Sequence, residues 1–327
     1  MWIFGDVMKV FVQIPCLNEE QTLPLVLESI PKKIPGVELE VLIVDDGSTD
    51  KTIEIAKKYG VKHFVKHIRN MGLARSFRDG VMYALEHGAD IVVNTDGDNQ
   101  YPQDRIPDLI QPIIDGTAEI VVADRQTHKI EHFSPLKKML QRLGSYIVNR
   151  AAGTDLPDAA SGFRAYSRES LIRLNIVTPF SYCMETIIQA GNKRLAITSI
   201  PVTTNAKTRE SRLFKNMWQH VFKSMAAIIR SYIMYRPYMV FATLGYSLLA
   251  LGLLPFARYL LMYIILKHPG AHLQSLLAGA VLLIGAFLCL VLNIVADLIR
   301  TNRILLEETL EQSRRHHLDH INGKEVL

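Results

Sequence analysis

The chain has 327 residues, of which 49% are hydrophobic and 21% charged, and its formal net charge is +5. This length accommodates one large domain with an appendage, and the positive charge suits an anionic partner: nucleic acid, a nucleotide or a lipid surface. The three cysteines, Cys16, Cys183 and Cys289, are far apart and form no CxxC or Cys/His spacing. That spacing argues against a disulfide framework and against a zinc site.

The first 210 or so residues alternate short apolar runs with charged segments punctuated by glycine and proline. The N-terminal segment MWIFGDVMKVFVQIP carries Asp6 and Lys9 and is not a signal peptide, so we expect this part of the chain in the cytosol. Strands are predicted at residues 9–14, 40–44, 62–66, 91–94 and 119–123, and a helix is predicted at 72–87. This order predicts an α/β fold with a mostly parallel sheet covered by helices.

Polar clusters follow three of these predicted strands. Pro15-Cys16-Leu17-Asn18-Glu19-Glu20 follows the first strand, Asp45-Asp46-Gly47-Ser48 the second, and Asp96-Gly97-Asp98 the fourth. In open α/β sheets, ligands bind outside the carboxyl ends of the strands. Three polar clusters at such ends indicate a binding site more strongly than any one of them alone.

Asp96 and Asp98 are the first candidates for a metal site. Two carboxylates one residue apart at a strand end can both reach one hard divalent cation. Mg²⁺ or Mn²⁺ bound there would bridge a donor diphosphate and neutralise the charge that develops on the leaving group. The alternative is an ordinary surface turn, because Asp pairs are common in turns.

Asp45 and Asp46 are candidates for binding a nucleoside, because a carboxylate can accept hydrogen bonds from a base or a ribose. Gly47 permits the tight turn that this position needs. Pro15 would set the preceding loop, and Glu19 would hydrogen-bond the nucleoside. The alternative is that Asp45-Asp46-Gly47-Ser48 serves only as a turn and helix cap.

The last third of the chain has the composition of a membrane anchor. Residues 213–236 place Lys and Arg between apolar residues at helical spacing, as in interfacial helices, although an amphipathic helix packed on the domain would show the same pattern. Residues 238–257 and 275–296 are two charge-free runs, each long enough to span hydrocarbon as a helix. We predict a hairpin with spans at about 238–261 and 274–298, joined by a turn at 267–270.

Flanking charges favour a cytoplasmic location for both termini. Four arginines flank the proposed cytoplasmic ends of the spans: Arg230, Arg236, Arg300 and Arg303. Arg258 and Lys267 lie at or near the far side, which leaves a modest positive-inside bias. The predicted organisation is a cytoplasmic domain at 1–212, interfacial helices at 213–237, a transmembrane hairpin at 238–299 and a charged, helical cytoplasmic tail at 300–327.

The motif set resembles that of the family 2 glycosyltransferases. It consists of Pro-Cys-Leu-Asn-Glu-Glu, Val-Asp-Asp-Gly-Ser-Thr-Asp, Arg69-Asn70-Met71-Gly72 and Asp96-Gly97-Asp98. Residues 158–164 (DAASGFR) and 209–213 (RESRL) are similar to the dolichol-phosphate mannose synthase and polyprenyl-phosphate glycosyltransferase branch. The resemblance covers about residues 9–236. This sequence departs from the branch at two places. It has DGDNQYP where the branch usually has DADLQHP, and it has Ser211-Arg212 where the branch usually has Ser-Lys.

The resemblance implies a GT-A fold, with a Rossmann-like mixed and mostly parallel sheet, and a role for each motif. The implied nucleotide-sugar contacts are Pro15, Glu19, Asp45, Asp46, Arg75 and Asp96. The implied metal ligands are Asp96, Asp98 and Gln100. The implied catalytic residues are Asp98, Arg125, Arg209 and Arg212, since Arg suits phosphate binding. The implied acceptor-side residues are Arg125, Ser161, Arg164, Glu185, Ser211 and Arg212, although Glu185 can equally support the helix after Pro179.

The implied reaction is inverting transfer of a hexose-type sugar from a UDP- or GDP-linked nucleotide sugar to polyprenyl or dolichyl phosphate, with Mg²⁺ or Mn²⁺. A lipid phosphate is already an anion and can attack C1 in line, so catalysis would depend on positioning and charge stabilisation. Membrane lipids are expected partners. Nucleic acid is not, because the basic residues cluster beside the membrane spans. The sequence leaves open the sugar and whether the chain forms a homo-oligomer.

Several other function classes are weaker. A Rossmann oxidoreductase is disfavoured because no GxGxxG follows the first strand, and a processive polysaccharide synthase because QxxRW is absent. A non-catalytic membrane scaffold with a degenerate transferase domain is opposed by the intact strand-end carboxylates. A transferase acting on another membrane-lipid acceptor stays open.

Overall fold

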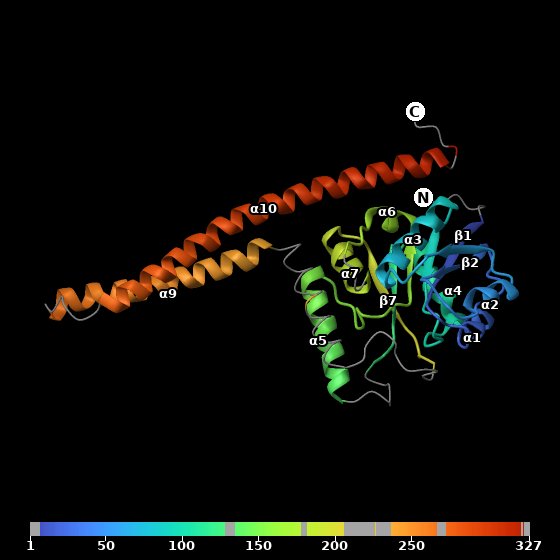
Figure 1. Cartoon of the computed structure of the whole chain (residues 1–327), viewed down its shortest axis with the longest axis horizontal. Coiled ribbons are helices and arrows are strands. Elements are labelled where there is room, and N and C mark those ends of the chain that lie inside the picture. The colour runs from blue at the N-terminus through green and yellow to red at the C-terminus, as the bar shows by residue number, and fades with distance from the viewer. Residues whose placement is uncertain are drawn as a thin grey trace. The chain divides into compact units, whose positions relative to one another are not determined.

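The computed structural model of the chain describes residues 7–127, 135–177, 182–205, 226, 237–266, 273–321 and 323. It divides into two compact units, shown in Figure 1: Met1–Ile229 with Leu310–Leu327, here the sheet unit, and Arg230–Thr309, here the hairpin unit. The end of the predicted tail therefore belongs to the sheet unit. Most of the predicted interfacial segment, 213–237, lies outside the described residues.

The sheet unit contains one seven-stranded sheet in the order β3-β2-β1-β4-β6-β5-β7. Its strands are β1 (Met8–Cys16), β2 (Val37–Asp45), β3 (His63–Lys66), β4 (Ile91–Asn94), β5 (Ile120–Asp124), β6 (Arg164–Ser167) and β7 (Ile197–Pro201). β6 is antiparallel to β4 and β5, and all other pairs are parallel. The predicted mixed, mostly parallel sheet is confirmed.

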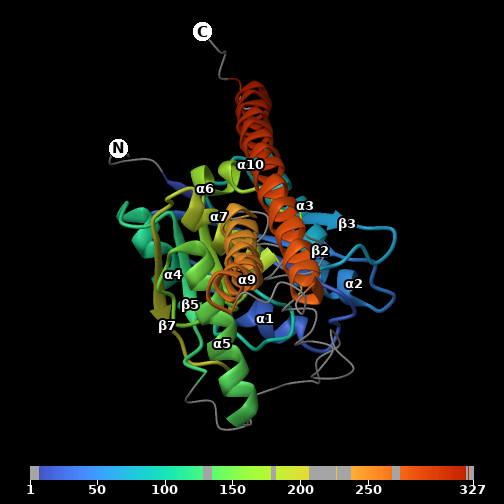
Figure 2. The same cartoon turned by 90° about the vertical axis from the view of Figure 1, so that its left-hand side faces the viewer.

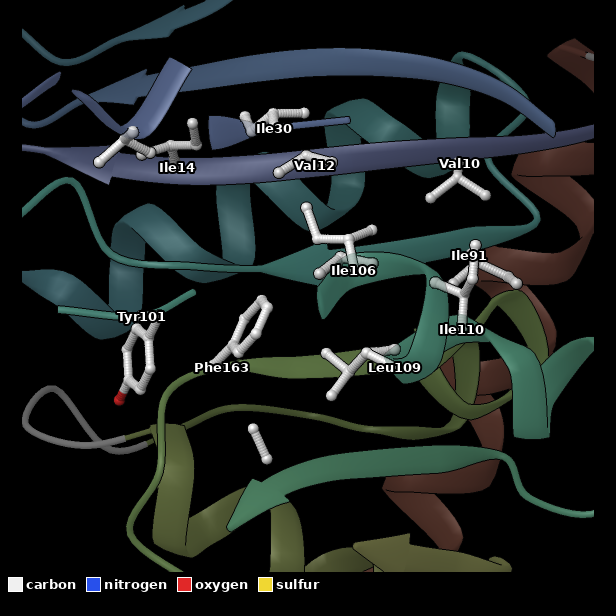
Figure 3. Close-up of a cluster of buried hydrophobic side chains, with 14 of the residues drawn as sticks. Val10, Val12, Ile14, Ile30, Ile91, Tyr101, Ile106, Leu109, Ile110 and Phe163 are labelled. Carbon is white, nitrogen blue, oxygen red and sulfur yellow. The ribbon is translucent and has the colours of Figure 1, made fainter. Parts of the chain in front are cut away.

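Helices cover both faces of this sheet. They are α1 (Leu23–Ser29), α2 (Thr52–Lys58), α3 (Leu73–Glu86), α4 (Ile106–Ile114), α5 (Pro135–Ala152), α6 (Arg168–Arg173) and α7 (Tyr182–Asn192), with a 3-10 turn at Gln103–Arg105. Side chains alternate between faces along a strand, so Val10 and Val12 of β1 join Ile106 of α4 in the core cluster of Figure 3. On the opposite face, the Gln13 amide donates to Phe77 O of α3 at 3.1 Å.

Helix α3 packs closely on the sheet at Gly80. A Cβ at this position would come within 2.6 Å of Val44 Cγ2 and 2.8 Å of Gln13 Cδ. Any larger residue would push α3 away from β1 and β2. Because α3 begins directly beside the loop after β2, this contact also positions one edge of the strand-end site.

The hairpin unit consists of α9 (Pro237–Leu266) and the N-terminal part of α10 (Leu273–Ile321). Both helices are long and apolar enough to cross a membrane. A Cβ on Gly279 would lie 3.0 Å from Gly252 O, so small residues permit close helix packing. The predicted spans fall within these two helices, and the predicted turn at 267–270 lies outside the described residues.

The C-terminal end of α10 packs within the sheet unit. Arg314 Nη1 donates to Ile172 O at 3.2 Å and to Leu174 O at 2.6 Å, two carbonyls at the C-terminal end of α6, where the last carbonyls of a helix lack partners within it. Leu318 is buried, and His317 Nε2 lies 3.2 Å from Glu86 Oε1. Helix α10 continues without a break to Ile321, so the described part of the predicted tail is helical, and its cytoplasmic location stays a prediction.

Candidate active site

The polar clusters after β1, β2 and β4 meet at one edge of the sheet. β1 pairs in parallel with β2 on one side and β4 on the other, so the sheet changes winding direction at β1. The loop after β1 contacts both neighbouring loops: Asn18 N donates to Ser48 Oγ at 2.9 Å, and Thr22 Oγ1 donates to Gly97 O at 2.7 Å. The three clusters predicted from separate motifs therefore form one site.

The loop after β2 makes the predicted tight turn. Gly47 has φ +83°, and a Cβ there would lie 2.8 Å from the carbonyl carbon of Arg69. Glycine is thus required both for the backbone conformation and for the passage of the Arg69-Asn70 segment.

The two carboxylates of this loop are held differently. Asp46 Oδ1 accepts from Met71 N at 2.8 Å and lies 2.7 Å from His67 Nδ1, while Oδ2 accepts from Gly72 N at 2.9 Å. Asp46 thereby fixes the start of α3. Asp45 is fully buried, and its Oδ2 has no hydrogen-bond partner among the described residues. A nucleoside contact by either carboxylate stays a prediction.

The loop after β4 presents Asp96 and Asp98 half-buried. Gln100 holds Asp98 from two directions: its backbone N donates to Oδ1 at 3.2 Å and its Nε2 to Oδ2 at 2.9 Å. The described residues contain no cluster of three or more His, Cys, Asp or Glu side chains that could hold a metal. Two carboxylates fit a Mg²⁺ or Mn²⁺ that takes its remaining ligands from water and a substrate diphosphate. Ligation by Asp96, Asp98 and Gln100 stays a prediction.

Gly162 brings the DAASGFR segment (158–164) against this loop. A Cβ on Gly162 would lie 3.4 Å from Asp96 Oδ2, and its backbone N donates to Tyr101 Oη at 2.8 Å. Asn94 Nδ2, at the end of β4, donates to Gly162 O at 3.1 Å. The segment that the sequence places on the acceptor side therefore lies beside the candidate metal ligands.

Arg125, at the carboxyl end of β5, forms a bidentate ion pair with Asp158. Arg125 Nε lies 2.6 Å from Asp158 Oδ2, and Nη2 lies 2.9 Å from Oδ1. The side chains are only 16% and 3% exposed. The pair uses Nε and Nη2, so Nη1 has no partner among the described residues. The two bonds also fix the plane of the guanidinium. A guanidinium held in one plane suits the recognition of phosphate.

The charges of this pair are stabilised in the folded protein. Burial by itself would raise the pKa of Asp158, but the neighbouring Arg125 charge and its hydrogen bonds lower that pKa below its ordinary value. Burial is the largest single influence on Arg125 and would lower its pKa, but the surrounding charges and hydrogen bonds, chiefly those of Asp158, together raise that pKa. Both groups are ionised throughout the neutral pH range.

Two predicted acceptor-side residues are enclosed by protein. Arg164 is fully buried and donates to four acceptors: Ala159 O, Ser161 O, Cys183 O and Thr186 Oγ1. Glu185 is 1% exposed, and its Oε1 accepts from Val177 N at 3.1 Å. Contact of either with an acceptor stays a prediction, and this packing favours structural roles instead. The bond to Val177 ties Glu185 to the segment before α7, and the alternative that Glu185 supports the helix after Pro179 stays a prediction.

The remaining predicted residues are placed as follows. Pro15 pairs with Val44 near the end of the β1–β2 ladder. Arg75, in the first turn of α3, is 47% exposed and pairs with Asp79 at 2.6 Å. Ser161 is buried, with no partner for its Oγ among the described residues. Glu19 is buried beside Gly97. Arg209, Ser211 and Arg212 lie outside the described residues.

Asn205 is a site residue that the sequence did not indicate. Its backbone N donates to Gln100 O at 3.0 Å, and its Nδ2 donates to Asn99 O at 3.1 Å and to Tyr101 O at 3.0 Å. Asn99 has φ +59°, in the left-handed region. Asn205 thus holds the turn that carries the metal-ligand candidates, from a position 105 residues along the chain from Gln100.

We expect Asn205→Ala to weaken metal binding about tenfold while the protein stays folded. The substitution removes the Nδ2 hydrogen bonds to Asn99 and Tyr101, each with a net contribution of about 0.5–1.5 kcal/mol, and keeps the bond of the backbone N to Gln100 O. Electron paramagnetic resonance titration with Mn²⁺ measures the affinity directly. Asn192→Ala, which removes an Nδ2 bond to Ile188 O on α7, is the matched control. Equal Mn²⁺ affinity in both variants would show that Asn205 does not position the ligands.

Comparison with known proteins assigns this arrangement to a sequence family. The family profile described as Glycosyl transferase family 2 matches residues 11–174. The UDP-N-acetylglucosamine–dolichyl-phosphate N-acetylglucosaminyltransferase of Methanococcus voltae is 31% identical over 216 residues, covering 60% of this chain and 85% of that protein. The dolichol-phosphate mannosyltransferase of Pyrococcus furiosus is 32% identical over 219 residues, covering 63% of this chain and 59% of that protein.

A solved structure supports the fold. Glucosyl-3-phosphoglycerate synthase of Mycobacterium tuberculosis, crystallised with Mn²⁺, uridine diphosphate and glucosyl-3-phosphoglycerate, superposes with a TM-score of 0.54 at 22% identity. The match covers 69% of this chain and 79% of that one. At this identity the likeness extends to the GT-A-like architecture alone.

Proposed function

Because the chain belongs to glycosyl transferase family 2, we propose that it transfers a hexose-type sugar from a UDP- or GDP-linked donor to the phosphate of a polyprenyl or dolichyl phosphate. Relatives at about 30% identity bear the names of dolichyl- and polyprenyl-phosphate glycosyltransferases. The observation that carries the proposal is that Asp158, the partner of Arg125, belongs to the DAASGFR segment (158–164), whose Gly162 lies close to Asp96. The guanidinium that we propose as an anion-binding group is therefore held by the segment that lies beside a candidate metal ligand.

The proposed reaction depends on the positioning of donor and acceptor and on the stabilisation of negative charge on their phosphates. A divalent cation held by Asp96 and Asp98, with Gln100 in support, would neutralise the departing nucleoside diphosphate. Arg125, oriented by Asp158, would hold a phosphate group of donor or acceptor. The acceptor phosphate is an anion at neutral pH, so it can attack C1 opposite the leaving group, and the anomeric centre inverts.

The apolar helices α9 and α10 support an acceptor that resides in a membrane. Each is compatible with a membrane span by length and composition. We propose that they form a hairpin with both chain termini in the cytoplasm, as the flanking arginines favour. Arg209 and Arg212 precede the first span by fewer than 30 residues, and we propose that they bind the lipid phosphate near the membrane surface.

A paired-acceptor assay tests this function. The full chain in detergent is incubated with Mn²⁺ or Mg²⁺, a panel of labelled UDP- and GDP-sugars, and either a polyprenyl phosphate or the polyprenol of equal length. We expect a labelled lipid with one nucleotide class, and kcat/KM at least about a hundredfold lower for the polyprenol, whose missing phosphate leaves Arg side chains unpaired. Equal use of both acceptors would exclude phosphate recognition. No transfer from any donor would favour the non-catalytic scaffold.

A further inference from the structure

Helix α5 carries an exposed apolar stripe. Met139, Leu143 and Tyr146 are 58%, 47% and 65% exposed, and their i, i+4, i+7 spacing places them on one face. Among the described helices α1 to α7, no other exposes more than one large apolar side chain. Single exposed apolar residues are ordinary, but a row of three on one helix marks an interaction surface.

The charge of α5 identifies the kind of partner. Its 18 residues include Lys137, Lys138, Arg142 and Arg150 and no Asp or Glu. Arg142 and Arg150 are exposed and lie three residues after Met139 and four after Tyr146, so they border the stripe. An apolar stripe on a helix whose charged residues are all cations matches a bilayer surface with anionic headgroups, whereas the face of a soluble protein would offer mixed charges.

The opposite face of α5 holds the helix rigidly in the sheet unit, at whose edge Figure 2 shows it in green. Val148 and Ala152 are buried, and a Cβ on Gly191 of α7 would lie only 2.1 Å from Ala152 O, so the two helices are in close contact. Ser145 Oγ accepts from Ala159 N at 3.2 Å, and Asn149 Nδ2 donates to Leu156 O at 2.8 Å. Helix α5 therefore positions the loop that carries Asp158.

We propose that the Met139-Leu143-Tyr146 face of α5 docks on the surface of an anionic membrane. Docking places the apolar side chains below the headgroups and the bordering arginines among them. Since α5 holds the loop of Asp158, docking also brings the Arg125–Asp158 pair to the level of the headgroups. If the acceptor is a lipid phosphate, as proposed above, this is the level at which its phosphate lies.

A spin-label measurement tests the docking without any need for turnover. The full chain carrying Leu143→Cys is labelled with a nitroxide and reconstituted in phosphatidylcholine bilayers with or without phosphatidylglycerol. Leu25→Cys on α1, 45% exposed in the native residue, is the matched control, and the unsubstituted chain gives the background of the native cysteines. Collisions with oxygen report lipid exposure, and collisions with a water-soluble nickel chelate report water exposure.

We expect the label at 143 to lie about 5–10 Å inside the headgroup boundary when phosphatidylglycerol is present, and the label at 25 to stay in water. Combining Arg142→Glu with Arg150→Glu should lower the ratio of docked to undocked helix by at least about fivefold per charge. Lys57→Glu with Lys58→Glu on α2 should leave that ratio unchanged. Equal water exposure at 143 and 25 overturns the proposal. So does a label at 143 shielded from both reagents, because protein would then cover the stripe.

Discussion

Replacing Asp98 with Ala is expected to lower sugar transfer by more than about a thousandfold while leaving the fold intact. The expectation follows from the proposed metal site, in which Asp98 is one of two carboxylates and a bound cation supplies several kcal/mol of charge stabilisation. Asp98 is half-buried on a loop, outside the strands and helices, and it accepts hydrogen bonds from Gln100, two residues away. Its removal therefore leaves the sheet and core unchanged. Formation of labelled lipid at saturating Mn²⁺ measures the effect.

The matched control is Asp104→Ala, an exposed carboxylate six residues further along the chain. It removes the same charge from the same region, and we expect nearly native transfer. The two variants should have melting temperatures close to that of the native protein. Undiminished turnover in Asp98→Ala would refute the metal assignment, whatever the identity of the sugar.

Replacing Asp158 with Asn is expected to cost about 3–5 kcal/mol of stability and most of the transfer activity. The substitution leaves the Arg125 guanidinium buried without a counter-charge, and loss of one partner of a buried pair is strongly destabilising. For a unit of this size the melting temperature should fall by at least about 6 °C. Asp155→Asn changes an exposed carboxylate in the same loop and should have no such effect. Equal melting temperatures for the two variants would show that the pair is dispensable.

The pH dependence of this pair has a definite sign. Because Asp158 has a lowered pKa in the folded protein, its contribution to stability is fully present above its pKa in the unfolded chain, which is about 3.9. That contribution is lost as the pH falls through the folded value. Native protein and Asp158→Asn should therefore differ in stability by a constant amount between pH 6 and 8, and should converge only below about pH 4.

The central strands could be predicted from sequence because they are buried on both faces and read as continuous apolar runs. The predicted run 91–94 coincides with β4, and 40–44 lies inside β2. The strands β6 and β7 were missed. β6 has four residues and begins with Arg164, whose burial depends on four acceptors that only the folded chain brings together. β7 lies at the sheet edge and is only half-buried, so its apolar signal is weak.

Site residues could be predicted where polar side chains directly follow a predicted strand. They were harder to predict where segments far apart in the sequence come together. Asp96 and Asp98 follow an apolar strand directly, so the rule for parallel sheets was sufficient. Asn205 could not be found this way, because its contacts join residues more than 100 positions apart and an isolated Asn carries no spacing signal. Arg125 was expected to contact phosphate, but its pairing with Asp158, 33 residues away, emerges only from the fold.

The C-terminal part of α10 belongs to the sheet unit, and this has a consequence for the order in which the protein folds during synthesis. Arg314 contacts carbonyls at the end of α6 and Leu318 is buried, yet the ribosome makes both residues only after the whole hairpin unit. The sheet unit is therefore discontinuous in the chain, with the hairpin unit inserted between its first and last residues. Its final packing step must therefore wait until the ribosome has translated the hairpin unit. A fragment that stops before residue 237 ends synthesis with the carbonyls of Ile172 and Leu174 still uncapped.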